Sequence, residues 1–258
     1  MSYKIAINGY GRIGRCVLRA FYESTNYADL RIVAINDLAD IGNLAHLTRY
    51  DSTHGRFLGE VEQGDGELMV SGDAIRVSQQ ADVANLRWND LEIDLVMECS
   101  GTFTDRETAQ IHLANGAKRV LFSQPADSDV DATLVYGINH ETLAHDATII
   151  SNASCTTNCI VPVLKAIDEV FGIDHGVITT IHSAMNDQPV IDSYHHQDLR
   201  KTRSAMQSII PVDTALAKGI ERILPNLNGR LQAQAIRVPT VNASAMDLTL
   251  TLNSDATV

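Results

Sequence analysis

A glycine-rich turn near the N-terminus places the tightest constraint on the fold of this chain. The segment Gly9–Gly14 reads G-x-G-x-x-G. It follows an apolar run, Tyr3–Asn8, and precedes a stretch with helical periodicity, Arg15–Ser24. Between a strand and a helix, such glycines permit a sharp turn and the close approach of backbone to a pyrophosphate. The motif therefore predicts a dinucleotide-binding fold, and glycines that only turn a strand into a helix are the alternative.

The rest of the first half alternates apolar runs with helical stretches, which is typical of a parallel sheet with crossover helices. One helix is expected over Thr104–Asn115, ending at a glycine. The expected strands are Leu30–Asn36, Leu68–Val70, Ala74–Val77, Leu95–Cys99, Arg119–Phe122, Leu134–Tyr136 and Ile149–Ile150.

The pattern changes after residue 151. A long helix is expected over Cys155–Phe171 and a shorter one over Thr214–Ile223. The strand-rich segments there are His175–Met185, Leu231–Val238 and Met246–Leu252. We predict an α/β chain with a Rossmann dinucleotide-binding domain over residues 1–151. We expect residues 152–258 to form an α+β catalytic domain with a largely antiparallel sheet. Because the chain stops at Val258 soon after a strand, we expect this domain to be C-terminally incomplete.

Composition excludes several classes of function. The 258 residues carry a formal net charge of −12, which argues against a nucleic-acid partner, since such partners require a basic face. No apolar run approaches the roughly 20 residues of a membrane span, and no signal peptide is recognisable, so we expect a cytoplasmic protein without a membrane partner. The four cysteines lack metal-ligand spacing, which favours reduced thiols and no metal site.

Asp37 indicates which dinucleotide is bound. It ends the second expected strand, where a carboxylate would accept hydrogen bonds from the ribose hydroxyls and repel a 2′-phosphate. NAD is therefore favoured over NADP, with a plain strand-end carboxylate as the alternative. The candidate cofactor-binding residues are Gly9, Gly11, Arg12, Ile13, Gly14, Asp37, Ser100, Gly101 and Ser123.

The segment Ser151–Cys159 is the most informative for chemistry. It places Cys155 at the start of the long expected helix, where the helix dipole favours the thiolate. Cys159 lies one turn further in, and we expect it to pack as a small hydrophobic residue. His182 lies in an expected strand and is the candidate base for Cys155. From spacing alone, a structural role for His182 is an equal alternative.

Four motifs resemble the glyceraldehyde-3-phosphate dehydrogenase superfamily, and the resemblance covers the whole chain. They are Ile7–Arg15, Ala34–Asp37, Ser151–Asn158 and Arg237–Thr240. The resemblance implies NAD as cofactor, a homotetramer, and a thiohemiacetal and then a thioacyl intermediate on Cys155. It also implies that His182 is the catalytic base.

The residues after His182 resemble one branch of that superfamily. Members that act on glyceraldehyde 3-phosphate usually carry phosphate-binding threonines there, whereas this chain has Met185 and Asp187, which donate no hydrogen bonds. Thr214 is kept, but Ala215 replaces the usual glycine. This pattern resembles erythrose-4-phosphate dehydrogenases. It implies NAD-dependent oxidation of D-erythrose 4-phosphate to 4-phosphoerythronate, with release of the acyl group by water, in vitamin B6 biosynthesis.

The substrate is thus expected to be a small phosphorylated aldehyde. Arg203 and Arg237 are the candidate cations for its phosphate, because a guanidinium can grip two phosphate oxygens. Ion pairs within the protein are the alternative for both arginines. The candidate substrate-binding residues are Ser154, Thr156, Arg203, Thr214, Ala215 and Arg237. A phosphorylating glyceraldehyde-3-phosphate dehydrogenase remains the alternative enzyme, and an inactive nucleotide-binding protein is the alternative of another class.

Overall fold

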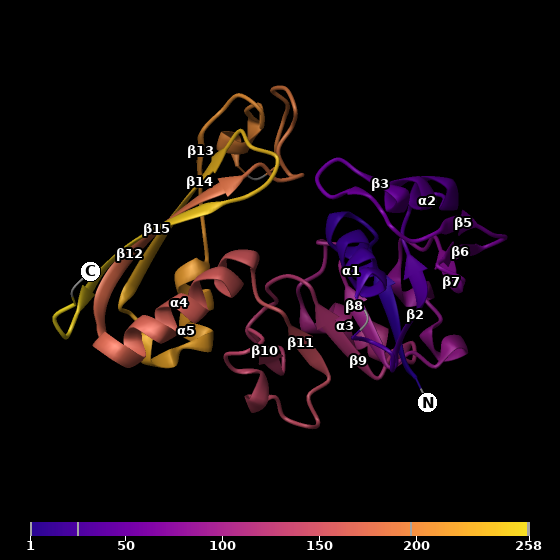
Figure 1. Ribbon diagram of the computed structural model, residues 1–258, viewed down its shortest axis with the longest axis horizontal. Coiled ribbons are helices and arrows are strands. Elements are labelled where there is room, and N and C mark those ends of the chain that lie inside the picture. Colours follow the sequence, from indigo (N-terminus) through magenta and orange to yellow (C-terminus); the bar gives the residue numbers. More distant parts are fainter. Residues whose placement is uncertain (1, 25, 197, 257–258) are drawn as a thin grey trace. The chain divides into compact units, whose positions relative to one another are not determined.

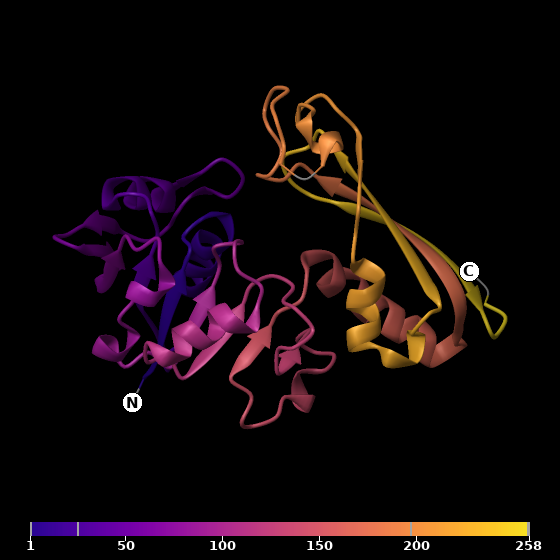
Figure 2. The same ribbon diagram turned by 180° about the vertical axis from the view of Figure 1, so that it is seen from behind.

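The chain forms two compact units. The computed structural model describes residues 2–24, 26–196 and 198–256. The first unit spans Met1–Leu134 and Asn139–Ala153, and the second spans Val135–Ile138 and Ser154–Val258. The first is coloured indigo to magenta in Figure 1 and the second mainly orange to yellow; Figure 2 shows both from behind.

The first unit is built on one sheet with the strand order β10-β11-β9-β8-β1-β2-β7-β6-β5. In this order, the first seven strands, β10 through β7, pair in parallel. Strands β6 and β5 then continue the sheet through antiparallel pairing. The strands of this sheet are β1 (Tyr3–Asn8), β2 (Leu30–Asn36), β5 (Val61–Gln63), β6 (Glu67–Val70), β7 (Asp73–Ser78), β8 (Leu95–Glu98), β9 (Arg119–Phe122), β10 (Ala132–Thr133) and β11 (Ile149–Ser151). The helices are α1 (Arg12–Glu23), α2 (Ile41–Arg49) and α3 (Arg106–Ala114), and a small hairpin joins β3 (Tyr50–Asp51) to β4 (Gly55–Arg56).

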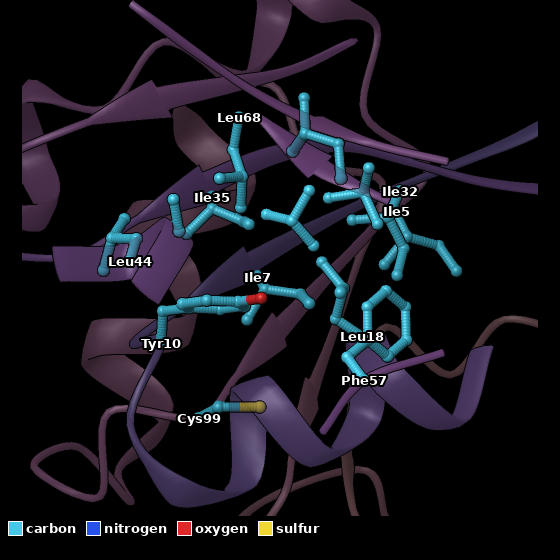
Figure 3. Packing of buried hydrophobic residues seen from close by; sticks show 14 residues of the cluster. Ile5, Ile7, Tyr10, Leu18, Ile32, Ile35, Leu44, Phe57, Leu68 and Cys99 are labelled. Carbon is cyan, nitrogen blue, oxygen red and sulfur yellow. The ribbon is translucent and has the colours of Figure 1, made fainter. Parts of the chain in front are cut away.

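Both faces of this sheet are buried, because successive side chains of a strand point to opposite faces. Ile5 and Ile7 of β1 lie in a cluster with Leu18 of α1 and Leu44 of α2 (Figure 3). Ala6, between the two isoleucines, packs into a separate cluster that includes Ile93 and Trp88. A mainly parallel sheet covered on both faces is the expected Rossmann-type architecture, and this prediction is confirmed.

The second unit has a mixed sheet with the strand order β13-β14-β12-β15. Strands β12 (Ile173–Ser183) and β14 (Leu231–Val238) run in parallel, whereas β13 (Ile210–Val212) and β15 (Ala245–Leu252) pair with them in the antiparallel sense. Helices α4 (Cys155–Phe171) and α5 (Leu216–Ile223) lie side by side in both views of the chain (Figures 1 and 2). The predicted α+β class of this unit is confirmed; its sheet contains one parallel pair among the antiparallel ones.

Several predicted elements differ from those observed. Leu134–Tyr136 is not a strand: the short strand β10 precedes it, and the chain then turns, with Ile138 N–H donating to Val135 O. The predicted helix Thr104–Asn115 begins only at Arg106, because the Asp105 side chain accepts from Thr108 N–H and caps it. The predicted strand from His175 begins and ends two residues earlier.

Short turns of 3₁₀ helix, each of three or four residues, lie at Val83–Asn85, Trp88–Leu91, His140–Thr142, Leu199–Thr202 and Pro225–Leu227. Among the described residues, no helix has both the length and the apolar character needed to cross a membrane.

Candidate functional site

In the glycine turn (Gly9–Gly14), two glycines have no space for a Cβ and the third has open space. Gly9 has a φ of +88°, and a Cβ there would lie 2.4 Å from the backbone of Ser100. A Cβ on Gly14 would lie 2.3 Å from the Gly9 carbonyl oxygen. Gly11, by contrast, would place its Cβ with no atom within 4 Å. The turn therefore leaves a free backbone surface at Gly11, directly before α1, where a pyrophosphate would fit.

Asp37 and Arg12 hold this turn from two sides. The Asp37 carboxylate accepts hydrogen bonds from Tyr10 N–H at 2.7 Å and Ala39 N–H at 2.9 Å. Arg12 forms an ion pair with Asp51 at 2.7 Å, and this hydrogen bond raises the pKa of the Arg12 guanidinium. Both residues thus fasten the turn to neighbouring segments, and contact of either with a cofactor remains a prediction.

The remaining cofactor candidates lie at the same edge of the sheet. Ser100 and Gly101 follow β8, which is next to β1 in the parallel sheet, and Ser123 follows β9, which is next to β8. Ser100 N–H donates to the Glu98 side chain at 2.8 Å, and Ser123 N–H donates to the Glu98 carbonyl at 3.0 Å. Ile13 stands half-exposed in the first turn of α1. Below, the cofactor edge means these carboxyl ends of β1, β2, β8 and β9.

In the second unit, helix α4 begins at the cysteine that the sequence singled out. Ser154 is the N-cap, and its hydroxyl accepts from Thr157 N–H at 3.0 Å. Cys155 is therefore the first helical residue, exposed to solvent, at the positive end of the helix dipole. The Thr156 hydroxyl lies 2.9 Å from the Ser154 hydroxyl. This places Cys155 between two candidate donors to a bound anion.

His182 reaches this cysteine from strand β12. Its Nε2 lies 3.6 Å from Cys155 Sγ, and its Nδ1 lies 2.7 Å from the Ser183 carbonyl oxygen. Since a carbonyl oxygen only accepts, Nδ1 carries a proton and Nε2 faces the sulfur. The structure thus brings together the predicted nucleophile and base, which are 27 residues apart in the sequence.

The two groups shift each other's titration in opposite directions. The hydrogen bond from His182 lowers the pKa of Cys155 despite partial burial, with a smaller contribution from the Thr156 N–H. The same hydrogen bond raises the pKa of His182, with a further contribution from the Ser183 carbonyl. Both shifts favour a thiolate beside an imidazolium, which is the reactive form of a nucleophilic cysteine.

Arg237 lies beside His182, because the two are register partners on β14 and β12. Arg237 is buried and forms an ion pair with Asp187, which also pairs with Lys201 at 3.0 Å. Burial opposes ionisation of Asp187, but the hydrogen bonds from Arg237 and Lys201 outweigh it and lower its pKa. Two cations and one carboxylate leave a net positive charge at this cluster. Apart from its charge, Lys201 gave no signal in the sequence.

The other predicted substrate residues occupy separate positions. Arg203 forms an ion pair with Asp192 at 2.8 Å, with more than half of each side chain exposed. This is the alternative that the sequence left open for both arginines. Thr214 is exposed and accepts from Leu216 N–H at 3.2 Å, next to Ala215, the N-cap of α5.

One expectation about the cysteines is wrong. Cys159 is exposed in the second unit rather than packed. Helix α4 buries Thr157, Ile160, Val161 and Leu164, and Cys159 falls outside that stripe. Cys99, in the first unit, is the buried one, and burial raises the pKa of its thiol to about 11.

Comparison with known families assigns both halves of the chain. Residues 3–106 match "Glyceraldehyde 3-phosphate dehydrogenase, NAD binding domain", and residues 154–258 match "Glyceraldehyde 3-phosphate dehydrogenase, C-terminal domain". The chain has both domains of the glyceraldehyde-3-phosphate dehydrogenase family. Its first unit is accordingly an NAD-binding domain, and the open backbone at Gly11 is consistent with that cofactor. The family assignment makes the chain an NAD-dependent oxidoreductase by its domains.

Proposed function

We propose that this chain oxidises D-erythrose 4-phosphate to 4-phosphoerythronate, with NAD as the oxidant and water releasing the product from Cys155. The observation that carries the dehydrogenase chemistry is the Cys155–His182 pair, in a family that acts on phosphorylated aldehydes. The observation that favours this substrate branch is Met185, which offers no hydrogen-bond donor three residues after His182.

The pair can carry each proton that the reaction moves. The Cys155 thiolate attacks the aldehyde carbon, and His182 Nε2–H donates to the oxygen that becomes an alcohol. Bound NAD supplies the hydride acceptor for the oxidation. His182 then takes the hydroxyl proton as the carbonyl of the thioacyl group forms. His182 releases this proton to solvent and is neutral again. In the last step it accepts a proton from water while the water oxygen bonds to the acyl carbon. The C–S bond then breaks, so the acid leaves and the thiolate is restored beside the imidazolium.

The Arg237 cluster supports a substrate that carries its own phosphate. Arg237, Lys201 and Asp187 leave one net positive charge next to His182, which suits a phosphate ester attached to the aldehyde. Asp187 orients the Arg237 guanidinium, and Met185 adds no donor for a further anion. We therefore propose that water, rather than inorganic phosphate, releases the thioacyl group.

A phosphorylating glyceraldehyde-3-phosphate dehydrogenase is the second candidate. Thr214 is retained, and Ser154 and Thr156 present hydroxyls beside Cys155 that could donate to inorganic phosphate. The same Cys155–His182 pair would serve either reaction. Because the chain resembles the erythrose-4-phosphate dehydrogenase branch, we also propose that it forms a cytoplasmic homotetramer and that its product enters vitamin B6 biosynthesis.

The test is NADH formation with each aldehyde, with and without inorganic phosphate, beside a Cys155→Ala control. We expect cysteine-dependent oxidation of erythrose 4-phosphate that needs no phosphate. Preference for glyceraldehyde 3-phosphate with strict phosphate dependence would establish the second candidate instead.

Met185→Thr sharpens the substrate assignment. A hydroxyl at this position adds a donor two residues before Asp187, so we expect the kcat/KM for glyceraldehyde 3-phosphate to rise about 3- to 10-fold relative to erythrose 4-phosphate. Met185→Leu, which adds no donor, is the control. An equal change in both variants would show that the size of the side chain, and not its donor, matters.

A further inference from the structure

A chain of buried hydrogen bonds runs beneath the cofactor edge of the first unit, and no step of the proposed reaction uses it. Trp88 Nε1 donates to His112 Nδ1 at 3.0 Å, and His112 Nε2 lies 3.2 Å from Glu98 Oε2. From the other side, Asn36 Nδ2 donates to Asn8 Oδ1 at 2.8 Å, and Asn8 Nδ2 donates to Glu98 Oε2. Glu98 and His112 are both completely buried.

The donor and the acceptor of each of these buried hydrogen bonds can be assigned. An indole N–H can only donate, so His112 must accept through Nδ1 and carry its proton on Nε2. That proton points at Glu98, which therefore accepts from His112 and Asn8 through one oxygen and from Ser100 N–H through the other. Glu98 is the common acceptor on which both arms end.

Two of the three donors to Glu98, Asn8 and the Ser100 amide, lie beside Gly9, the first residue of the glycine turn. Asn8 directly precedes Gly9, and Ser100 is the residue whose backbone a Cβ on Gly9 would strike at 2.4 Å. Cys99 N–H also donates to the Asn8 carbonyl at 2.7 Å, and Gly9 N–H donates to the Asn36 carbonyl at 2.8 Å. The ends of β1, β2 and β8 are thus held together by these backbone bonds and, through Asn8 and Ser100, by the Glu98 carboxylate.

We propose that His112 is a positioning residue for NAD: through Glu98 it fixes Asn8 and the Ser100 amide, and so the backbone surface on which the pyrophosphate binds. A buried carboxylate that lost one of its donors would draw Asn8 or Ser100 out of place. This inference rests on the NAD-binding domain alone and is independent of which aldehyde is oxidised.

The experiment measures NAD affinity by calorimetry in His112→Leu and His112→Gln variants of the whole chain. Leucine removes both hydrogen bonds, and we expect NAD to bind roughly 10-fold more weakly. Glutamine offers a donor and an acceptor on one side chain, and we expect it to restore affinity to within about 3-fold of the wild type. In turnover, the KM for NAD should rise while the kcat and the KM for the aldehyde stay unchanged.

Leu68→Ala is the matched control, because Leu68 is completely buried in the first unit but belongs to β6, which β7 separates from β2 in the sheet. We expect it to lower the melting temperature without changing NAD affinity. If His112→Leu binds NAD as the wild type does, or if Leu68→Ala weakens NAD binding equally, the inference is wrong.

Trp88→Phe provides a second test should His112→Leu fail to fold. It keeps a smaller aromatic ring in the cluster that contains Trp88, and it removes the donor that fixes the His112 tautomer. We expect NAD affinity to fall by about 3-fold, because the His112–Glu98 bond is then no longer enforced. Wild-type NAD affinity in Trp88→Phe would overturn the proposal.

Discussion

The cofactor edge of the first unit and the cysteine site of the second are built in different ways. The edge depends on close backbone contacts at Gly9 and Gly14, where a Cβ would collide, and on buried side chains that hold the strand ends. The cysteine site is set by two exposed or half-exposed side chains from a helix and a strand, 3.6 Å apart. Substitutions at the edge should therefore change folding or cofactor affinity, whereas substitutions at the cysteine site should change chemistry.

Cys155→Ala is the substitution with the largest expected effect. Loss of the nucleophile should lower turnover by about 10⁴-fold or more, while NAD affinity stays at the wild-type value. Turnover by NADH formation and NAD affinity by calorimetry check the two halves of this expectation. Cys159→Ala, on the same helix, should keep full turnover. Loss of NAD affinity in Cys155→Ala would break the distinction between the two regions.

His182→Gln should lower kcat by about 10² to 10⁴-fold. It should also shift thiol reactivity: His182 holds the pKa of Cys155 below its ordinary value of 9.0, so without it the thiolate forms only at higher pH. The rate of alkylation by iodoacetamide against pH, measured in a Cys159→Ala background, reports this directly. An unchanged pH profile would mean that the helix terminus alone activates the thiol.

Gly9→Ala should destabilise the first unit by about 3 kcal/mol, from a strained positive φ and a collision with Ser100. Gly66→Ala is the matched control: its φ is +74°, but its Cβ would meet nothing within 4 Å, so only the strain of about 1 kcal/mol applies. Urea unfolding of both variants measures the difference. Equal losses would show that the contact with Ser100 relaxes freely.

Gly11→Ala has the smallest expected effect on folding, and it should change NAD affinity without changing stability. Its φ is −72° and its Cβ has open space, so stability should change by less than about 0.5 kcal/mol. NAD affinity should still fall about 10-fold, because the added methyl occupies the surface left for the pyrophosphate. Unchanged affinity would place the pyrophosphate elsewhere.

The difference between the cofactor edge and the cysteine site also explains which features the sequence could predict. The glycine turn is local, so the glycines and the segments on either side of them, residues 3–24, indicated its strand, turn and helix. The fold class followed from the alternation of elements. Helix α4 was predicted from Cys155 to Phe171 because capping residues precede it and Gly172 ends it. In these cases neighbouring residues contain the physical cause.

The cysteine site needed information that is not local. The contact of Cys155 with His182 depends on how β12 crosses the start of α4, and spacing alone left a structural role for His182 open. The pairing of Asp187 with both Arg237 and Lys201 joins residues up to 50 apart and was not predicted. Cys159 was placed incorrectly because helical spacing does not reveal which face of α4 is covered.

The most direct test of the central claim is to trap the acyl group on the protein. The enzyme, NAD and erythrose 4-phosphate are mixed, quenched with acid within one turnover, and mapped by peptide mass spectrometry. The account predicts an acyl adduct on Cys155 that is absent from His182→Gln at the same reaction time. An adduct on Cys159, or none on any cysteine while NADH forms, would contradict it.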